Sequence, residues 1–373
     1  MISPMIKTFC EMAEIISPSR KEKQICEYVK KELSEISSEI IIDETQKFTQ
    51  SETGNLIVKI PGDKKLKPFL LSAHLDTVST ETKPNIIVKN GFITTANKTI
   101  LGADCKAGIA IIIHAVKELI KEKINHPPLE LVFSVCEEIG LLGTRFMKKD
   151  LLKSKYGLVF DNEKKINEVV ISSVGVDNFT IDVKGIAAHS GVEPEKGVSA
   201  ISIISKIISQ ITQGRISKNT TINIGFVKGG SGINIVPPFA QAEGEIRSFD
   251  LKEIIKVESK IKQIVDFVSS QKEYKKSKCL INIRKRFESF SIEKDKVLLK
   301  NIENSYKKIG LKAKFIKSFG GTDANNFFKM GIKTANIPTG MKNVHTPYEK
   351  LNIKEAIISK DVAKSIIAEM AKE

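Results

Sequence analysis

Four short, strongly apolar segments restrict the fold more than any other feature of this sequence. They are NLIVKI (55–60), PFLLSAH (68–74), LELVFSVCEE (129–138) and YGLVFDN (156–162). A longer apolar segment of helical length, KAGIAIIIHAVKELIKE (106–122), separates the second from the third. Strands that are apolar on both faces and alternate with helices are typical of a parallel sheet covered by helices. We therefore expect an α/β fold with a mostly parallel sheet.

The pattern changes after about residue 176, where polar and apolar residues begin to alternate. Three alternating segments, NFTIDVKG, TINIGFVKGG and AQAEGEIRSFD, are separated by helices predicted near residues 197–213 and 251–271. Such alternation is typical of antiparallel strands with one face in water. The helical segment KDKVLLKNIENSYKKIG then resumes the first pattern. We predict one discontinuous domain, residues 1–176 and 288–373, interrupted by an inserted α+β domain, residues 177–287.

The composition argues against several classes of protein. No run approaches the roughly 18 consecutive apolar residues of a membrane span, and the segment MISPMIKTFCEMAEII lacks the features of a secretory signal. Five scattered cysteines without CxxC spacing argue against a disulfide framework or a thiolate zinc site. The net charge of +15 comes mostly from dispersed lysines, and no nucleic-acid-binding motif accompanies it. We therefore expect a cytoplasmic protein that binds no membrane, with nucleic-acid binding only as a remote alternative.

The segment FLLSAHLDTVS (69–79) ends an apolar strand with His74 and Asp76. Residues two apart on a strand point to the same face, so these side chains can share one small space. A carboxylate beside an imidazole fixes the tautomer of a metal-binding histidine. A solvated pair at a strand end is the ordinary alternative. Upstream, Ser17 or Ser19 is expected to cap the helix KEKQICEYVKKELSEI.

Other acidic and histidine residues follow the same strands or lie in loops. They are Asp104 in LGADCKAG, Glu137 and Glu138 in FSVCEEIG, Asp161 in LVFDNE, and His345 in GMKNVHTPYE. Each has an ordinary explanation, such as a helix N-cap for Asp104 and a solvated loop or turn for the others. Together those explanations require five coincidences at one sheet edge, the edge where open α/β sheets bind ligands. Two histidines and several carboxylates gathered there suit a pair of divalent metal ions.

Two further histidines are expected to stay outside this cluster. His114 lies in the apolar segment IAIIIHAVKEL and is predicted to pack in the core. His126 precedes two prolines and is predicted to lie on the surface.

The order of several short motifs points to a known family. SAHLDTV, GADCKAG, EEIG, FDN, GGTDANNF and NVHTPYE resemble, in order, the motifs of the dinuclear zinc exopeptidases. That family includes peptidase T, succinyl-diaminopimelate desuccinylases, glutamate carboxypeptidases and aminoacylases. The resemblance covers nearly the whole chain and looks closest to peptidase T. It implies a metal-binding catalytic domain built from residues 1–176 and 288–373, and a dimerisation or lid domain at residues 177–287.

The resemblance also implies a set of metal ligands. Asp104 would bridge two divalent ions, with zinc as the family default and cobalt or manganese as alternatives. His74 and Asp161 would complete one site, and Glu138 and His345 would complete the other. Donors of these types suit several divalent metals, so the ligands alone do not select the ion.

Three residues beside these ligands receive other roles from the resemblance. Glu137 would be the general base, since it is adjacent to a ligand but not itself bound, and Asp76 would clamp His74. Related peptidases commonly carry Asp after the bridging aspartate, whereas this chain has Cys105. The family often has a cis peptide at that position, and Cys105 is expected to keep this backbone role.

The inserted domain would contribute further catalytic and substrate-binding residues. By the resemblance, His189 in GIAAHSG and Asn234 in GGSGINIVP reach the active site of a partner subunit in a homodimer, where His189 supports the oxyanion. Arg247 in EGEIRSF would bind a substrate carboxylate, which its planar fork suits. Gly321 and Thr322 in GGTDANNF are assigned to substrate binding. A hairpin histidine, a turn asparagine and a strand-surface arginine are the ordinary alternatives for the first three.

The resemblance indicates an aminopeptidase that acts on di- or tripeptides. Members that cut from the amino end tend to carry Asp at the position of Asp161, whereas carboxypeptidases and deacylases tend to carry Glu. An N-acyl-amino-acid deacylase or a dipeptidase is the alternative within the family. Outside that class we also consider a metal protein without catalytic activity, although the intact Glu137 argues against it.

Overall fold

The computed structural model describes residues 3–80 and 82–372, which fall into two compact units. Unit 1 contains the residues up to Ser172, Phe290–Ser318, and the residues from Thr322 onward. Unit 2 contains Ser173–Ser289 together with Phe319–Gly321. The segment 177–287, which the sequence pattern sets apart, lies inside unit 2.

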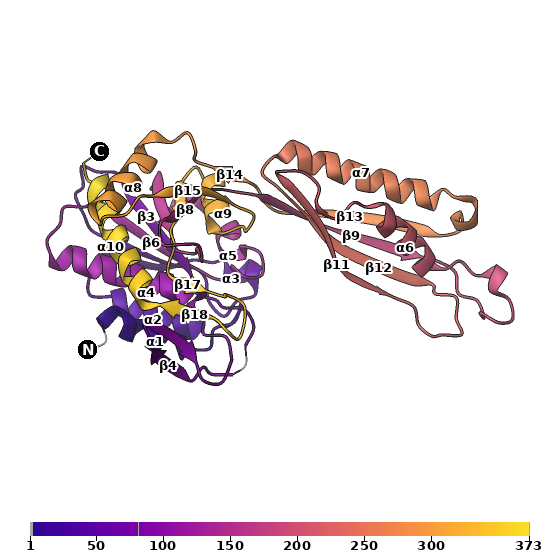
Figure 1. Ribbon diagram of the computed structural model, residues 1–373, viewed down its shortest axis with the longest axis horizontal. Coiled ribbons are helices and arrows are strands. Elements are labelled where there is room, and N and C mark those ends of the chain that lie inside the picture. Colours follow the sequence, from indigo (N-terminus) through magenta and orange to yellow (C-terminus); the bar gives the residue numbers. More distant parts are fainter. Residues whose placement is uncertain (1–2, 81, 373) are drawn as a thin grey trace. The chain divides into compact units, whose positions relative to one another are not determined.

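Unit 1 is built on a mixed sheet flanked by helices (Figure 1). Its middle strands β6, β3, β7 and β16 run parallel to one another. The flanking pairs β1–β2, β2–β6 and β16–β8 are antiparallel. The predicted α/β class is confirmed, with the parallel part confined to the middle. In order across the sheet, the strands are β1 (Glu39–Ile42), β2 (Leu56–Ile60), β6 (Leu129–Ser134), β3 (Phe69–His74), β7 (Tyr156–Val159), β16 (Lys333–Asn336), β8 (Glu168–Ser173) and β14 (Phe290–Ser291), with β15 (Lys314–Ser318) paired to β8.

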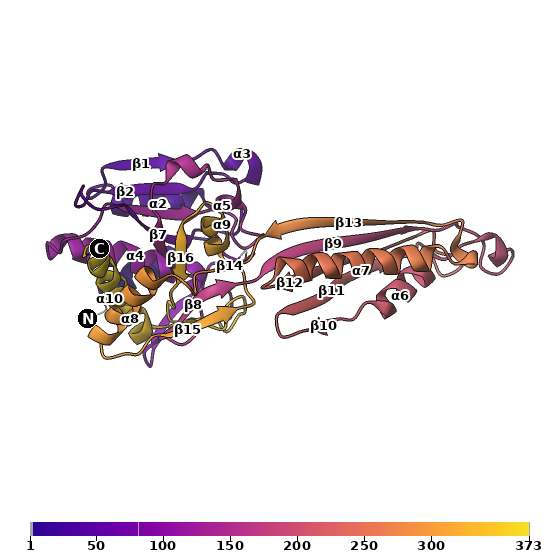
Figure 2. The same ribbon diagram turned by 90° about the horizontal axis from the view of Figure 1, so that it is seen from above.

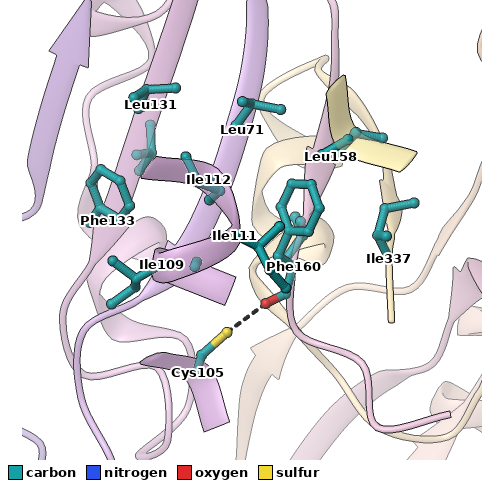
Figure 3. Packing of buried hydrophobic residues seen from close by; sticks show 14 of the residues in the cluster. Leu71, Cys105, Ile109, Ile111, Ile112, Leu131, Phe133, Leu158, Phe160 and Ile337 are labelled. Carbon is teal, nitrogen blue, oxygen red and sulfur yellow. Dashed lines mark hydrogen bonds between the residues drawn. The ribbon is translucent and has the colours of Figure 1, made fainter. Parts of the chain in front are cut away.

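The core of unit 1 forms where α4 (Ala103–Lys121) packs on β3. Figure 3 shows isoleucines of α4 beside apolar side chains of β3, β6 and β7. From Ile109 onward the buried residues of α4 are all aliphatic, so burial in the core rather than intrinsic propensity stabilises this helix. The other helices of unit 1 are α1 (Pro4–Ala13), α2 (Lys23–Leu33), α3 (Gln46–Thr49), α5 (Leu142–Phe146), α8 (Lys296–Lys308), α9 (Asp323–Lys329) and α10 (Ile353–Met370).

A small antiparallel sheet lies apart from the large one in unit 1. Its order is β17 (Met341–Lys342), β18 (Lys350–Asn352), β5 (Phe92–Thr95) and β4 (Ile86–Lys89). The loop 343–349 joins β17 to β18 and contains His345. Because β17 and β18 pair directly, this loop has a fixed base.

Unit 2 is an antiparallel sheet with two helices on one face (Figure 2). The strand order is β10 (Gly214–Arg215), β11 (Thr220–Gly229), β12 (Phe239–Ser248), β9 (Gly175–Lys184) and β13 (Lys278–Phe287). The helices α6 (Ala200–Gln210) and α7 (Leu251–Ser269) bury their apolar faces against β9, β12 and β13. The strands that enter and leave the unit pair with each other, Val176 opposite Phe287.

Among the residues described, none of the helices combines the length and the apolar character that a membrane crossing requires.

Candidate metal centre

Five side chains predicted as metal ligands come together in unit 1. His74 ends β3, Asp161 follows β7, and Glu138 follows β6, so three of them lie at carboxyl ends of parallel strands. Asp104 lies in the first turn of α4, and His345 lies in the loop between β17 and β18. The sheet edge therefore gathers residues from distant parts of the chain, as the strand-end argument predicts.

These side chains form two groups that share one carboxylate. In the first group, His74 Nε2 lies 3.1 Å from Asp104 Oδ1 and 3.9 Å from Asp161 Oδ1. In the second, His345 Nε2 lies 3.1 Å from Asp104 Oδ2 and 2.9 Å from Glu138 Oε1. Ligand atoms within each group lie within 4.8 Å of one another. Asp104 thus offers one oxygen to each group, which is the arrangement expected of a bridging carboxylate.

The electrostatics of the cluster favour bound cations. Burial raises the pKa of Asp161 well above its ordinary value, and the negative charge of Asp104 raises it further. Burial opposes ionisation of Asp104 as well, but hydrogen bonds from His345 and His74 hold its pKa below the usual range. Hydrogen bonds to Asp104 and Glu138 raise the pKa of His345 to about 10. The carboxylates compete for the two imidazoles, and divalent cations would neutralise this excess of negative charge.

The donor set fits a pair of zinc ions. Imidazole nitrogen and carboxylate oxygen are both ordinary zinc ligands, and three protein ligands with an open position are typical of catalytic zinc. Each group provides one imidazole and two carboxylates when Asp104 is shared.

The Cys105 thiol belongs to the first group by distance only. Its Sγ donates a hydrogen bond to the Phe160 carbonyl, 2.6 Å away, and the side chain is completely buried (Figure 3). Burial raises the pKa of this thiol well above its ordinary value, which favours the protonated form that donates to Phe160. A cis peptide bond joins Asp104 to Cys105, as the resemblance implies.

The carboxylate of Asp76 holds the turn that carries the two glutamates. Its Oδ1 accepts the Glu137 N–H at 2.9 Å, and its Oδ2 accepts the Glu138 N–H at 3.1 Å and the Ser19 hydroxyl at 2.6 Å. His74 Nδ1 lies 2.9 Å from the backbone oxygen of Asp76 and 3.5 Å from its Oδ1. The contact with His74 therefore runs mainly through the Asp76 main chain.

The predicted helix cap near the N-terminus is wrong. Helix α2 begins at Lys23 after Glu22, and no side chain caps it. Ser17 instead donates to the Leu75 carbonyl at 3.1 Å, and Ser19 donates to Asp76. Both hydroxyls therefore stabilise the two residues that follow β3.

Glu137 is positioned by a second buried carboxylate that the sequence analysis missed. Glu22 accepts the Cys136 N–H at 2.9 Å, and Cys136 has a left-handed backbone (φ 53°) immediately before Glu137. Burial raises the pKa of Glu137 well above its ordinary value. Glu137 belongs to neither ligand group, so its carboxylate remains available for proton transfer. Glu22 precedes an ordinary helical pattern, which gives no signal of this contact.

The predicted residues of unit 2 lie in exposed or strand positions. The loops of His189 and Asn234 pair with each other, since the Ser190 N–H donates to the Asn234 carbonyl at 3.0 Å, and both residues are exposed. Arg247, on β12, forms a two-pronged contact with Glu245, with distances of 2.7 Å and 2.9 Å. A substrate carboxylate would have to take the place of Glu245.

Gly321 and Thr322 have local structural roles. A Cβ at Gly321 would lie 2.1 Å from the Phe287 ring, so this position has no room for a side chain. Thr322 is the N-cap of α9 and forms a capping box with Asn325. Their assignment to substrate binding remains a prediction.

The two histidines outside the cluster differ in how deeply their side chains are buried. His114 is partly buried in the α4 region, and its Nε2 lies 2.9 Å from the Thr8 hydroxyl. The surface prediction for His126 is wrong, because its side chain is buried and its Nδ1 lies 2.8 Å from the Pro127 carbonyl oxygen. The segment around Gly62 packs against the main chain of these prolines, and the Asp63 N–H donates to the His126 carbonyl at 2.9 Å.

Comparisons with known proteins agree with the geometry of the site. The model described as "Peptidase family M28" matches residues 55–178, and "Peptidase dimerisation domain" matches residues 171–273. The protein YqjE of Bacillus subtilis is 32% identical over 99% of this chain and 98% of its own length. The crystal structure of aminopeptidase PepT from Bacillus cereus is 31% identical, covers 98% of both chains and has a TM-score of 0.90. The chain belongs to the peptidase T-like dinuclear zinc exopeptidases. A tripeptidase structure from Staphylococcus aureus, 28% identical over 99% of this chain and 98% of its own, has a TM-score of 0.93.

The family predicted from the ordered motifs is therefore confirmed, and the enzyme is a metallopeptidase. The two family matches divide this peptidase T-like chain much as its structure does. The M28 match contains four of the five predicted ligands, from His74 to Asp161. The dimerisation-domain match lies almost entirely within unit 2.

Proposed function

We propose that this peptidase binds two divalent ions and releases the N-terminal residue of di- or tripeptides. One ion would be held by His74, Asp104 and Asp161, and the other by Asp104, Glu138 and His345. The observation that carries the proposal is the Asp104 carboxylate, which points one oxygen at each histidine, 3.1 Å from either Nε2. Zinc is the ion proposed, with cobalt or manganese as alternatives.

The protein side chains would divide the chemistry between them. When bound, a pair of ions polarises a carbonyl and makes a water molecule more acidic. Glu137 would take the proton of that water and deliver it to the leaving amine, as a general base that becomes a general acid. Its carboxylate is in neither ligand group, which leaves it free for both steps. Asp76 would hold the backbone of the Glu137–Glu138 turn in place through its two hydrogen bonds to that turn.

Action at the amino end is supported by two observations. Asp161 stands where the family's carboxypeptidases and deacylases tend to carry Glu. The two similar solved structures described above are an aminopeptidase and a tripeptidase. A cytoplasmic location is proposed with this activity, because short peptides are abundant products of intracellular protein turnover.

The activity can be tested with a small panel of substrates. Free tripeptides, N-blocked peptides and N-acetyl amino acids are each incubated with the enzyme loaded with zinc, cobalt or manganese. We expect hydrolysis of free tripeptides and none of N-blocked peptides. Hydrolysis of N-acetyl amino acids would instead identify a deacylase. Two bound ions without hydrolysis of any substrate would identify a metal protein without catalytic activity.

We also propose that the enzyme is a homodimer whose subunits complete each other's sites. Unit 2 matches a peptidase dimerisation domain, and β11 exposes Phe226 and Val227 beyond its short pairing with β10, where it forms the edge of the sheet. An edge strand with exposed apolar residues is suited to pairing with a second copy. The exposed His189 would support the oxyanion in the partner's site, with Asn234 beside it.

Subunit mixing tests this arrangement. His189→Ala should be nearly inactive, because one oxyanion donor alone can contribute about 10²–10³ in kcat. Glu137→Ala should be inactive because it lacks the general base. In a mixed dimer, one site keeps its own Glu137 and receives an intact His189 from its partner. Exchange of subunits should therefore restore part of the activity. Exchange that is verified by a tag pull-down and yet restores nothing would refute the assignment of His189 to the partner's site.

A further inference from the structure

A buried carboxylate connects the two loops that carry Asp104 and His345. Glu349 lies four residues after His345 in the loop 343–349, and its side chain is only 2% exposed. Its Oε2 accepts the N–H groups of Leu101 and Gly102 at 2.9 Å and 2.8 Å. Its Oε1 accepts the Asp104 N–H at 3.0 Å. A single side chain thus accepts three main-chain hydrogen bonds, two from the turn before α4 and one from the first turn of α4.

The loop around His345 depends on this contact for its position. The His345 side chain is 48% exposed, so burial holds it only weakly. Within the loop, the Glu349 N–H donates to the Thr346 carbonyl at 3.1 Å, and the Thr346 hydroxyl donates to the Asn343 carbonyl at 2.7 Å. These short-range bonds make the loop compact, so a shift of Glu349 would carry His345 with it.

The turn before α4 is shaped to receive this carboxylate. Gly102 has a left-handed backbone (φ 75°), which lets the N–H groups of 101, 102 and 104 point to one side. Successive N–H groups arranged in this way form a concave site for an anion. The anion in this structure is part of the protein and comes from the segment that supplies His345.

We propose that Glu349 is a positioning residue that fixes the separation of His345 from Asp104. This inference rests on the proposed metal centre, and it concerns only the ion bound by Asp104, Glu138 and His345. Residues that hold metal ligands in place typically change metal affinity by about 10- to 100-fold. Loss of the Glu349 contact should therefore weaken this ion, while the ion at His74 and Asp161 is retained.

The substitution Glu349→Gln tests the proposal with little change in shape. Glutamine keeps one acceptor oxygen and replaces the other with an NH2 group, which cannot accept a hydrogen bond. It must lose either the Asp104 bond or the two bonds from Leu101 and Gly102. Glu349→Asp keeps both oxygens on a shorter side chain and should show a smaller loss. The matched control is Glu355→Gln, because Glu355 is a nearby acid that pairs with Lys342.

Zinc affinities are measured by competition with a fluorescent zinc chelator, and circular dichroism checks that each variant is folded. We expect two zinc ions in the wild type and in Glu355→Gln. In Glu349→Gln the weaker ion should lose about 10- to 100-fold in affinity. The same change is then made in His345→Ala and in His74→Ala. If Glu349 acts through His345, it should add less than about twofold in the first background and its full effect in the second.

The outcomes separate this inference from the proposed function. A wild type that binds no zinc would overturn the metal centre itself. Wild-type affinities for both ions in Glu349→Gln, or an equal loss in both histidine backgrounds, would overturn only the role of Glu349. Should Glu349→Gln prove unfolded, the comparison is made with Glu349→Asp, for which unchanged affinity is equally decisive.

Discussion

Replacing Asp76 with asparagine should impair catalysis through the turn that carries the general base. The Asp76 side chain is fully buried and accepts hydrogen bonds from Glu137, Glu138 and Ser19. Asparagine retains one acceptor oxygen, so the least disruptive rotamer keeps the Glu138 and Ser19 contacts and turns an NH2 group toward the Glu137 N–H. A hydrogen bond to a charged group contributes about 1.5–3 kcal/mol. We therefore expect a loss of about 2 kcal/mol.

That loss should appear in two measurements. If the misplaced Glu137 raises the activation free energy by this amount, kcat for a tripeptide should fall about 30-fold, since 1.36 kcal/mol corresponds to a factor of ten. The Tm of the metal-loaded enzyme should fall by about 3 °C, because unfolding a chain of 373 residues has an entropy of about 0.8 kcal/mol/K. Ser19→Ala serves as the control, because it removes one of the three contacts and leaves the carboxylate in place. Its effect on both quantities should be clearly smaller.

Metal content distinguishes the two roles that Asp76 could have. If the carboxylate acts mainly on the 137–138 turn, Asp76→Asn should still contain two ions per chain. If it acts mainly as a clamp on His74, the variant should lose the ion bound there. Unchanged kcat and Tm in Asp76→Asn would refute the structural reasoning altogether.

Three further results are expected. Glu137→Ala should abolish turnover while metal content stays near two ions per chain; loss of the ions would mean that the roles of Glu137 and Glu138 are exchanged. Arg247→Ala should raise KM for a free peptide at least about tenfold more than for its C-terminal amide, because a charge-assisted bond contributes about 1.5–3 kcal/mol; equal weakening would remove carboxylate binding from its role. Burial and the neighbouring Glu258 raise the pKa of Asp177 from 3.8 to about 7. The folded state therefore holds this proton more tightly than the unfolded state, and its stabilising contribution is lost as the pH rises from about 4 to 7. Asp177→Asn should flatten this part of the profile of Tm against pH, and a profile identical to that of the wild type would exclude Asp177 as its cause.

The sequence singles out the side chains that the fold brings together at the candidate centre, because metal chemistry restricts residue type. His74, Asp104 and Asp161 follow or precede strongly apolar elements, where a polar residue is conspicuous. Whether a buried strand pairs parallel or antiparallel cannot be predicted from residue type in the same way. β2 is as apolar as the parallel strands yet pairs antiparallel with β6, because both kinds of strand are buried in this sheet.

The residues that support the ligands are harder to predict for a different reason. Glu22, Asp76 and Glu349 each accept hydrogen bonds from backbone N–H groups. Almost every residue carries such a group, so the identity of the donor gives no indication of which carboxylate it meets. His126 shows the same limit for burial, because its position before two prolines gives no sign that its side chain is buried. Only the folded chain reveals these pairings.

The pairing of Val176 with Phe287 has a consequence for how this architecture can change over time. The two ends of unit 2 are neighbouring positions on adjacent antiparallel strands. An insertion whose ends already lie side by side can be lost, acquired or traded between relatives with a short junction and little entropy of loop closure. Such an exchange would leave the sequence of unit 1, and with it the proposed metal ligands, unchanged. Unit 2 can therefore be exchanged as a whole, which would let assembly and substrate range diverge while the metal-binding residues of unit 1 stay in place.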